Sequence, residues 1–249
     1  MSEAFGLDIG GSAIKAASVD VSTGELTSTR QTVATPDPST PEALVGVVHR
    51  LVAERGWTGP VGATFPAVIK HGIARTAANV DRSWIGTDVD GLFTRATNCP
   101  VTVLNDADAA GLAELRFGAA RDAPGDVVVI LTLGTGIGSA LFVGGKLVPN
   151  TELGHLELAG RDAEKDAAAS VKDRQHLTWS EWVPRVQRYL SHLEMLFTPD
   201  LFVLGGGVSK ESDQWVPLLD LRTPVRPAEL LNDAGIVGAA LAAAQQCGG

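Results

Sequence analysis

The chain has 249 residues, of which 45% are hydrophobic, and it carries 20 basic against 29 acidic side chains. A chain of this size can bury a full core and form one large or two modest domains. The acidic excess argues against a nucleic-acid partner, because such binding depends on basic side chains that neutralise backbone phosphates. No apolar run approaches the ~20 residues that span a bilayer, so no membrane partner is expected.

The cysteine content bears on the cellular compartment. Only two cysteines occur, Cys99 and Cys247, so a disulfide framework is not expected and a reducing environment fits best. The opening Met1-Ser2-Glu3-Ala4 lacks the basic and then apolar pattern of a signal peptide. These features predict a cytoplasmic protein.

The first part of the chain predicts a β-meander, a helix and a further strand. Three strands are expected over residues 5–9, 13–20 and 26–33. A helix begins near Pro41, because proline is favoured at the first helical position. Its apolar residues recur at helical spacing: Leu44, Val47, Val48, Leu51 and Val52. Residues 61–66 then read as a strand that ends in a loop.

The remaining elements give both halves of the chain a strand-rich opening. In order, we expect a strand over 101–104, a helix over 107–117, strands over 127–132 and 139–143, a hairpin closed by Gly144-Gly145, a helix opened by the capping box at 178–181, a strand over 201–204 and a small-residue helix over 235–244. This pattern predicts two similar α/β lobes with a cleft between them.

Three glycine-rich turns each follow an apolar run. They are Gly10-Gly11-Ser12, Gly134-Thr135-Gly136 and Gly205-Gly206-Gly207. One such turn would mean little, because glycine is the default residue of any tight hairpin. Three in this order predict loops that close around a string of phosphates, since bare amides approach a phosphate closely only where no Cβ intervenes.

Five motifs together make the chain resemble the ROK family, a group of repressors and sugar kinases. They are Asp8-Ile9-Gly10-Gly11-Ser12 with Lys15, Leu104-Asn105-Asp106-Ala107, Leu133-Gly134-Thr135-Gly136-Ile137-Gly138, Glu152-Leu153-Gly154-His155 and Leu204-Gly205-Gly206-Gly207-Val208-Ser209. The resemblance implies an α/β, two-lobed actin-like (ribonuclease-H-like) sugar kinase fold with a central cleft. It implies a smaller lobe of residues 1–106 plus 236–249, with the C-terminal helix returning to it, a larger lobe of residues 107–235, and a homodimer.

Within that family the chain is similar to the polyphosphate glucokinases of actinobacteria. These transfer a phosphoryl group from inorganic polyphosphate, often with ATP as a second donor, to glucose. Most of the family place a zinc-binding cysteine cluster after the Glu-x-Gly-His motif, whereas residues 160–170 here contain no cysteine. A tetrahedral zinc site needs thiolate or imidazole ligands, so we expect no zinc.

By this resemblance, Asp106 is the catalytic base that accepts the proton of the sugar's 6-hydroxyl. A junction of strand and helix directs its carboxylate into a cleft, and the helix dipole favours the ionised form that a base needs. The alternative is a helix N-cap, because such junctions prefer Asn, Asp and Ser. Asn105 offers a donor and an acceptor to adjacent sugar hydroxyls, or serves as a turn asparagine.

The resemblance assigns further residues to the sugar. Glu152 and His155 can together accept from and donate to neighbouring hydroxyls, as a hexose demands. Glu164 matches another glucose-binding glutamate, and its alternative is a helix-N-terminal glutamate beside Lys165. The loop at Thr64 and Pro66 corresponds to one that closes over the sugar, with Asn79 nearby.

The donor side is expected at the glycine turns. The resemblance assigns phosphate-donor binding to Asp8, Gly10, Gly11, Ser12, Lys15, Gly134, Thr135, Gly136, Gly205 and Gly206. Asp8 is the expected ligand of Mg²⁺, held through water, and its alternative is a turn-forming aspartate. Lys15 can place a cation near the donor phosphates or simply be exposed.

Three functions remain to be distinguished. The first is phosphorylation of glucose at its 6-hydroxyl by polyphosphate, with or without ATP as a donor. The second is an ATP-specific hexose or acylmannosamine kinase. The third is a sugar-responsive regulator, which would need a helix-turn-helix module before the first phosphate motif, where only seven residues precede Asp8. Residues 161–188 hold six basic and five acidic side chains, a balance typical of a solvated helical face.

Overall fold

The computed structural model describes residues 2–123 and 125–247. The chain forms two compact units: unit 1 runs to Ala113 and resumes at Asp233, and unit 2 is Glu114–Asn232. The division into lobes at residues 106 and 235 stays a prediction. Among the described residues, none of the helices combines the length and the apolar character that crossing a membrane requires.

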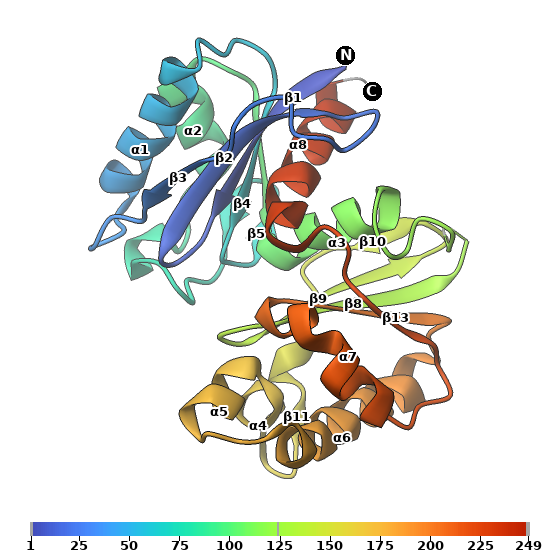
Figure 1. Ribbon diagram of the computed structural model, residues 1–249. Coiled ribbons are helices and arrows are strands. Elements are labelled where there is room, and N and C mark those ends of the chain that lie inside the picture. Colours follow the sequence, from blue (N-terminus) through green and yellow to red (C-terminus); the bar gives the residue numbers. More distant parts are fainter. Residues whose placement is uncertain (1, 124, 248–249) are drawn as a thin grey trace. The chain divides into compact units, whose positions relative to one another are not determined.

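A mixed five-stranded sheet forms the centre of unit 1 (Figure 1). In spatial order its strands are β3 (Gln31–Ala34), β2 (Ala13–Asp20), β1 (Glu3–Ile9), β4 (Val61–Phe65) and β7 (Val101–Asn105). β1 is antiparallel to β2 and parallel to β4. Because β4 and β7 are also parallel, the carboxyl ends of β1, β4 and β7 share one edge of the sheet.

The two faces of this sheet follow from the alternation of side chains along a strand. Phe5, Leu7 and Ile9 point into the core that α1 (Pro41–Glu54) and α2 (Val89–Thr97) cover. The alternate face lies under α8 (Ala234–Cys247), so the C-terminal helix returns to the first unit as expected (Figure 1).

Glycines on the α8 face let the helix backbone touch the sheet. A Cβ on Gly6 would lie 2.2 Å from the Ile236 carbonyl oxygen, and one on Gly62 would lie 1.8 Å from that of Ala239. Both distances are far inside van der Waals contact, so only glycine fits at either position. The small residues of α8 are therefore matched to small residues on the strands beneath it.

One expected strand of unit 1 is shorter than predicted, and four further elements of this unit were not predicted. The strand expected over 26–33 is shortened to β3, because the Ser28 hydroxyl accepts from the Ser18 N–H and interrupts the ladder after an isolated bridge at Leu26. Helix α2, nine residues long with a glycine in its first turn, was not predicted from the sequence. Two short strands and a 3₁₀ helix were not predicted either: β5 (Ile69–Lys70), β6 (Ile73–Ala74) and η1 (Arg82–Trp84).

Unit 2 repeats the sheet pattern of unit 1. In spatial order its strands are β10 (Lys146–Val148), β9 (Ile137–Val143), β8 (Val127–Leu133), β13 (Leu201–Gly205) and β14 (Val225–Pro227). β8 is antiparallel to β9 and parallel to β13, as β1 is to β2 and β4. The expectation of two similar α/β parts is therefore confirmed at the level of strand order and direction.

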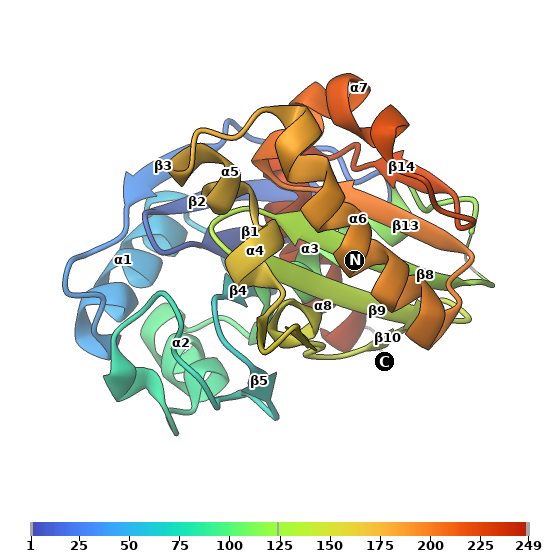
Figure 2. The same ribbon diagram turned by 90° about the horizontal axis from the view of Figure 1, so that it is seen from below.

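The helices of unit 2 pack on one face of its sheet (Figure 2). The longest, α6 (Trp179–Phe197), begins at the predicted capping box, where the Thr178 N–H donates to Glu181 at 2.9 Å. Its apolar residues Trp182, Val186 and Leu190 are buried in the core, as their helical spacing predicts.

The other elements of the chain are short or connect the two units. They are α3 (Asp106–Arg116), η2 (Leu153–His155), β11 (Glu157–Leu158), β12 (Arg161–Asp162), α4 (Glu164–Ala167), α5 (Ala169–Arg174), η3 (Gly207–Glu211), α7 (Ser212–Trp215), η4 (Val216–Leu218) and η5 (Leu231–Asp233).

Candidate active site

Asn105, rather than Asp106, caps helix α3. The Asn105 Oδ1 accepts hydrogen bonds from the N–H groups of Ala107, at 2.9 Å, and Asp108, at 3.1 Å. These are two of the amides that the start of a helix leaves unpaired. Asp106 occupies the first helical position and its side chain is exposed. Asp106 Oδ1 also accepts from the adjacent Ala107 N–H at 2.9 Å. The N-cap interpretation therefore applies chiefly to Asn105, and the exposed Asp106 carboxylate keeps acceptor capacity for a ligand.

The hydrogen bonds that Asn105 already forms within the protein limit how many it can form with a sugar. It is buried, its Oδ1 already accepts two hydrogen bonds, and its Nδ2 donates to the Ala67 carbonyl at 3.2 Å. One amide hydrogen remains for another acceptor. The bond to Ala67 ties the start of α3 to the loop that contains Pro66, which is itself buried.

Asp8 stands at the carboxyl end of β1, and three neighbours fix its position. Lys15 is its cross-strand partner on β2, and Lys15 Nζ lies 3.0 Å from Asp8 Oδ2. The Thr64 hydroxyl donates to Asp8 Oδ1 at 3.0 Å and accepts from the Ile9 N–H at 2.9 Å. A Cβ on Gly235 would meet the same carboxylate at 2.7 Å, so the first turn of α8 also packs against it.

These contacts change the interpretation of Thr64 and Lys15. Thr64 is fully buried and its hydroxyl is engaged with β1, so its evident role is to orient Asp8. Lys15 forms an ion pair with Asp8, and both side chains keep partial exposure, 29% and 19%. The two charges nearly cancel locally, yet each remains within reach of a ligand.

The first glycine turn is held from two sides. The Gly10 N–H donates to the Ala13 carbonyl at 3.0 Å, and the Thr35 hydroxyl donates to the Gly10 carbonyl at 2.6 Å. Gly11 packs on Asn79, where a Cβ would come within 3.0 Å of the Asn79 Cβ. Gly11 and Ser12 are exposed. The turn is thus rigid while its outer surface is open to solvent.

The two glycine turns of unit 2 lie next to each other. They follow β8 and β13, which are parallel neighbours in the sheet. A Cβ on Gly206 would lie 2.1 Å from the Leu133 carbonyl, immediately before Gly134, and Gly206 has a φ of 90°. The structure therefore brings Gly134, Thr135 and Gly136 together with Gly205 and Gly206, as expected of two loops that hold one ligand.

Glu164 joins the Gly134–Gly136 turn to the helical segment that follows β12. Its Oε2 accepts from the Ile137 N–H at 3.3 Å, and a Cβ on Gly136 would come within 2.4 Å of the same oxygen. The Ser170 hydroxyl donates to the Thr135 carbonyl at 2.7 Å from the next helix. The glutamate expected on the sugar side thus also contacts the expected donor turn.

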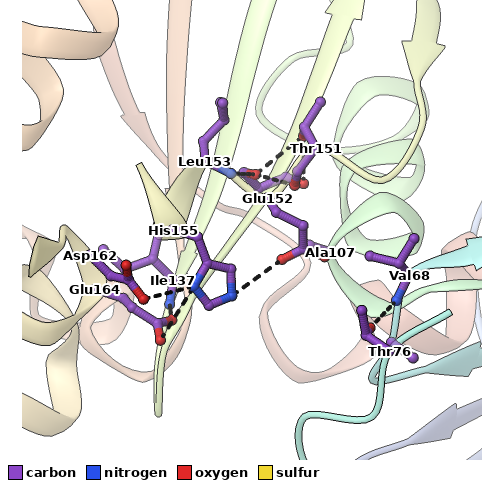
Figure 3. A network of polar contacts seen from close by, with 12 residues as sticks. Val68, Thr76, Ala107, Ile137, Thr151, Glu152, Leu153, His155, Asp162 and Glu164 are labelled. Carbon is purple, nitrogen blue, oxygen red and sulfur yellow. Dashed lines mark hydrogen bonds and ion pairs between the residues drawn. The ribbon is translucent and has the colours of Figure 1, made fainter. Parts of the chain in front are cut away.

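His155 lies among three carboxylates (Figure 3). Its Nδ1 is 3.2 Å from Asp162 Oδ2 and 4.0 Å from Glu164 Oε1, and its Nε2 is 3.9 Å from Glu152 Oε2. Such a set presents both hydrogen-bond donors and acceptors to a polyhydroxylated ligand. Glu152, His155 and Glu164 were expected together, and the structure brings them together.

Asp162 is the member of this cluster that was not predicted from the sequence. It comes to His155 because β12 pairs with β11 in an antiparallel hairpin. Two-residue strands give no periodic signal in a sequence. Asp162 stands two residues before Glu164, but nothing in that spacing indicates a partner for the histidine.

Gly154 sets the geometry of the Glu-Leu-Gly-His motif. A Cβ at this position would lie 2.3 Å from the Ile137 carbonyl oxygen on β9. The Ser139 hydroxyl also accepts from the Leu153 N–H at 3.0 Å. The short helix η2 is therefore held directly against β9, which fixes the backbone that carries Glu152 and His155.

Burial raises the pKa of the Glu152 carboxyl above its ordinary value of 4.5. The nearby His155 opposes this shift, and the negative charge of Glu164 adds to it. The group therefore gains its proton at a higher pH than a glutamate of ordinary pKa does.

Among the described residues, one cluster of three side chains and the single residue Asp8 are candidates for holding a metal ion. His155, Asp162 and Glu164 each present one ligand atom, and these atoms lie within 4.8 Å of one another. Asp8 is the second candidate, and each of its oxygens already accepts one hydrogen bond and keeps capacity for another. The absence of zinc stays a prediction that rests on the lack of cysteine over residues 160–170.

Comparisons with known proteins agree with this arrangement. The ROK family model matches residues 4–169. A polyphosphate glucokinase of Mycobacterium tuberculosis (strain CDC 1551 / Oshkosh) is 53% identical over 239 residues, which are 96% of this chain and 90% of the relative.

Two solved structures are similar over nearly their whole length. One is an inorganic polyphosphate/ATP-glucomannokinase from Arthrobacter sp. strain KM, with a TM-score of 0.93, 51% identity, and coverage of 99% of this chain and 100% of the other. The second is a ROK family glucokinase from Streptomyces griseus in complex with glucose and AMPPNP, with a TM-score of 0.83, 26% identity, and coverage of 98% and 99%.

Proposed function

The chain belongs to the ROK family, and on that premise we propose that it transfers the terminal phosphoryl group of inorganic polyphosphate, and also of ATP, to the 6-hydroxyl of glucose. The product is glucose 6-phosphate. Its α/β fold is that of the two-lobed, actin-like ROK sugar kinases. The observation that carries the proposal is the 53% identity to a polyphosphate glucokinase across 96% of the chain.

Asp106 is the proposed general base. Phosphoryl transfer is catalysed chiefly by positioning and by charge stabilisation, and a carboxylate that accepts the proton of the attacking hydroxyl completes the reaction. Asn105 Oδ1 accepts from the N–H groups of Ala107 and Asp108, while Asp106 Oδ1 accepts from the Ala107 N–H at 2.9 Å. The exposed Asp106 carboxylate keeps acceptor capacity for the hydroxyl proton. It accepts the proton as the 6-hydroxyl oxygen attacks the terminal phosphorus.

Glu152, His155 and Glu164 are the proposed sugar ligands. The two glutamates accept hydrogen bonds from sugar hydroxyls, and the imidazole either donates or accepts according to its tautomer. Asp162 is a positioning residue in this proposal, because it contacts His155 Nδ1 and thereby favours presentation of Nε2 to the sugar. Asn105, Thr64 and Pro66 stay predictions as sugar ligands.

Magnesium is the proposed cofactor, with Asp8 as its anchor through water. Each Asp8 oxygen accepts one protein hydrogen bond, so each retains a lone pair for a metal-bound water. Mg²⁺ keeps several of its waters in protein sites and suits this indirect mode. When bound, it offsets the charge of the donor phosphates. Lys15 is the proposed second cation for those phosphates.

The glycine turns are the proposed donor loops. Gly11 and Ser12 are exposed beside the partly buried Gly10 in unit 1. In unit 2, Thr135 is exposed between the partly buried Gly134 and Gly136, beside the exposed Gly206. Backbone amides bind phosphate oxygens without regard to the rest of the donor, which is consistent with the use of both polyphosphate and ATP.

The first test is the initial rate of glucose 6-phosphate formation with long-chain polyphosphate and with ATP, each with Mg²⁺ and after chelation. We expect faster turnover with polyphosphate and no turnover with either donor after chelation. Activity with ATP alone would contradict the polyphosphate assignment and favour an ATP-specific hexose or acylmannosamine kinase. Activity with neither donor would contradict glucose as the acceptor.

Glucose binding is expected to weaken as the pH falls. The weakening should begin at a higher pH than the ordinary pKa of a glutamate would predict. The raised pKa of Glu152 means that this acceptor is neutralised above pH 4.5. Calorimetric glucose titrations between about pH 5 and 8 should show a rising Kd on the acid side. The Glu152→Gln variant should bind glucose more weakly at pH 7, and its Kd should rise much less at low pH than that of the wild type.

Glu157→Gln is the matched control for this measurement, because Glu157 is an exposed glutamate on β11. It should keep the wild-type pH profile. If the Kd for glucose of Glu152→Gln still rises at low pH as it does in the wild type, the titrating group is another residue.

Three further properties are part of the proposal. A cytoplasmic location is supported by two unpaired cysteines, Cys99 and Cys247. A homodimer is supported by the resemblance within the family. The absence of a nucleic-acid or membrane partner is supported by the acidic composition and by the lack of long apolar runs.

A further inference from the structure

A cavity of about 240 Å³ lies in unit 2 between the β11–β12 hairpin and helix α6. Three arginines line it, Arg161 from β12 and Arg185 and Arg188 from α6, with Asp166 and Tyr189 between them. The volume is far larger than the ~10–15 Å³ that a single water requires. None of these residues belongs to the sugar or donor groups described above.

Local structure explains why the arginines converge. Residues 185, 188 and 189 follow the i, i+3, i+4 spacing that places side chains on one face of a helix. On the hairpin, Ala159 and Gly160 adopt positive φ angles of 53° and 82° and make a tight turn. Successive strand residues point to opposite sides, so Arg161 lines the cavity while Asp162 contacts His155.

The charges in this cavity are not balanced by the protein. Asp166 is the lining carboxylate, and it faces three guanidinium groups. Its oxygens lie 3.4 Å from Arg185 Nη1 and 3.4 Å from Arg188 Nη1. These distances exceed the ~2.7–2.9 Å of strong charge-assisted bonds. Among the residues that the structure describes, the Arg161 guanidinium makes no hydrogen bond or ion pair.

Tyr189 adds a second polar feature. It is 1% exposed and lines the cavity, and its hydroxyl is buried without a hydrogen-bond partner in the described part of the chain. Burial also raises the pKa of this phenol, so the hydroxyl stays protonated and remains a donor. A buried donor of this kind is normally satisfied by a protein group, a water or a ligand.

We propose that this arginine pocket, defined by Arg161, Arg185, Arg188, Asp166 and Tyr189, binds the oxyanion of a phosphoryl group. Three guanidinium groups against one carboxylate leave a net charge that suits a multiply charged anion better than a single carboxylate. Planar guanidinium groups also match the oxygen geometry of phosphate. The phosphoryl group comes either from a distal segment of a polyphosphate chain, which rests on the proposed function, or from free phosphate.

The test compares the double variant Arg161→Gln/Arg188→Gln with Arg174→Gln. Arg174 lies on α5, is exposed and does not line the cavity. The Arg174→Gln substitution therefore removes an arginine charge from residues 161–188 without changing the pocket. Binding of inorganic phosphate and of long-chain polyphosphate is measured by calorimetry at fixed ionic strength, without glucose. Circular dichroism confirms that each variant is folded. Tyr189→Phe, which keeps the ring, serves as a second variant.

We expect the double variant to lose about tenfold in affinity for at least one of these anions, and Arg174→Gln to lose less than about twofold. The steady-state KM distinguishes the sources. A rise in KM for long-chain polyphosphate, with the KM for ATP unchanged, identifies the polymer. A loss of phosphate binding with unchanged polyphosphate kinetics identifies free phosphate.

Two results would overturn the proposal. Wild-type affinity for both anions in the double variant would show that the pocket binds neither. An equal loss in Arg174→Gln would show a general charge effect. Because the binding assay needs no turnover, these outcomes are distinct from a failure of the kinase activity itself.

Discussion

Asp106→Asn is expected to lower kcat for glucose phosphorylation by about 10²–10⁴-fold, the usual contribution of a general base. The asparagine side chain has nearly the same shape but cannot accept the proton of the 6-hydroxyl. Helix α3 should be unaffected, because Asn105 supplies the capping oxygen to Ala107 and Asp108, and asparagine keeps the Oδ1 that Asp106 offers to the Ala107 N–H. The Kd for glucose should therefore change by no more than a few fold.

The measurement combines steady-state kinetics with calorimetric glucose binding on the same preparation. Glu42→Gln is a suitable control, since Glu42 is an exposed acid in the first turn of α1 and makes the same change of charge at a helix start. It should retain wild-type kcat. A variant at Asp106 that keeps kcat within about tenfold of wild type would remove this residue from the role of base.

The sequence predicted the glycine turns and the strands before them, because both signals are local. An apolar run followed by Gly10-Gly11 or Gly134-Thr135-Gly136 specifies a buried strand and a turn without reference to the rest of the fold. The residues that contact these turns were harder to predict from the sequence. The contact of Glu164 with the Ile137 N–H joins residues 27 apart, and only the folded chain reveals it.

The sequence did not show which of Asn105 and Asp106 caps helix α3. Both residue types cap helices well, and only the observed helix start decides which side chain receives the N–H groups. The same limit applies to Lys15. Its alternation on a strand was visible, but its pairing with Asp8 depends on the register of β1 with β2.

The candidate sugar site contains a residue that no sequence motif could reveal. Glu152 and His155 were found from a motif whose glycine has a physical reason, the contact of Gly154 with Ile137. Asp162 belongs to no such motif. It reaches His155 through a hairpin of two-residue strands, which are too short for hydrophobic periodicity to mark.

Gly62→Ala is expected to destabilise unit 1 by at least about 3 kcal/mol, at the upper end of the usual cost of overpacking. The added Cβ would lie 1.8 Å from the Ala239 carbonyl oxygen and 2.2 Å from its carbon. Both the strand and the helix present backbone here, so no side chain can rotate to make room. The helix α8 must shift away from β4, which also disturbs the packing of Gly235 against Asp8.

Gly46→Ala provides the opposite expectation in the same unit. Gly46 lies inside α1 with nothing within 4 Å of an added Cβ, so alanine should stabilise the protein by about 0.5–1 kcal/mol through its higher helix propensity. Urea unfolding of the two variants measures both effects. If Gly62→Ala unfolds at the wild-type midpoint, α8 does not rest on β4 as closely as described. A strong loss in both variants would point instead to a general intolerance of substitution in this unit.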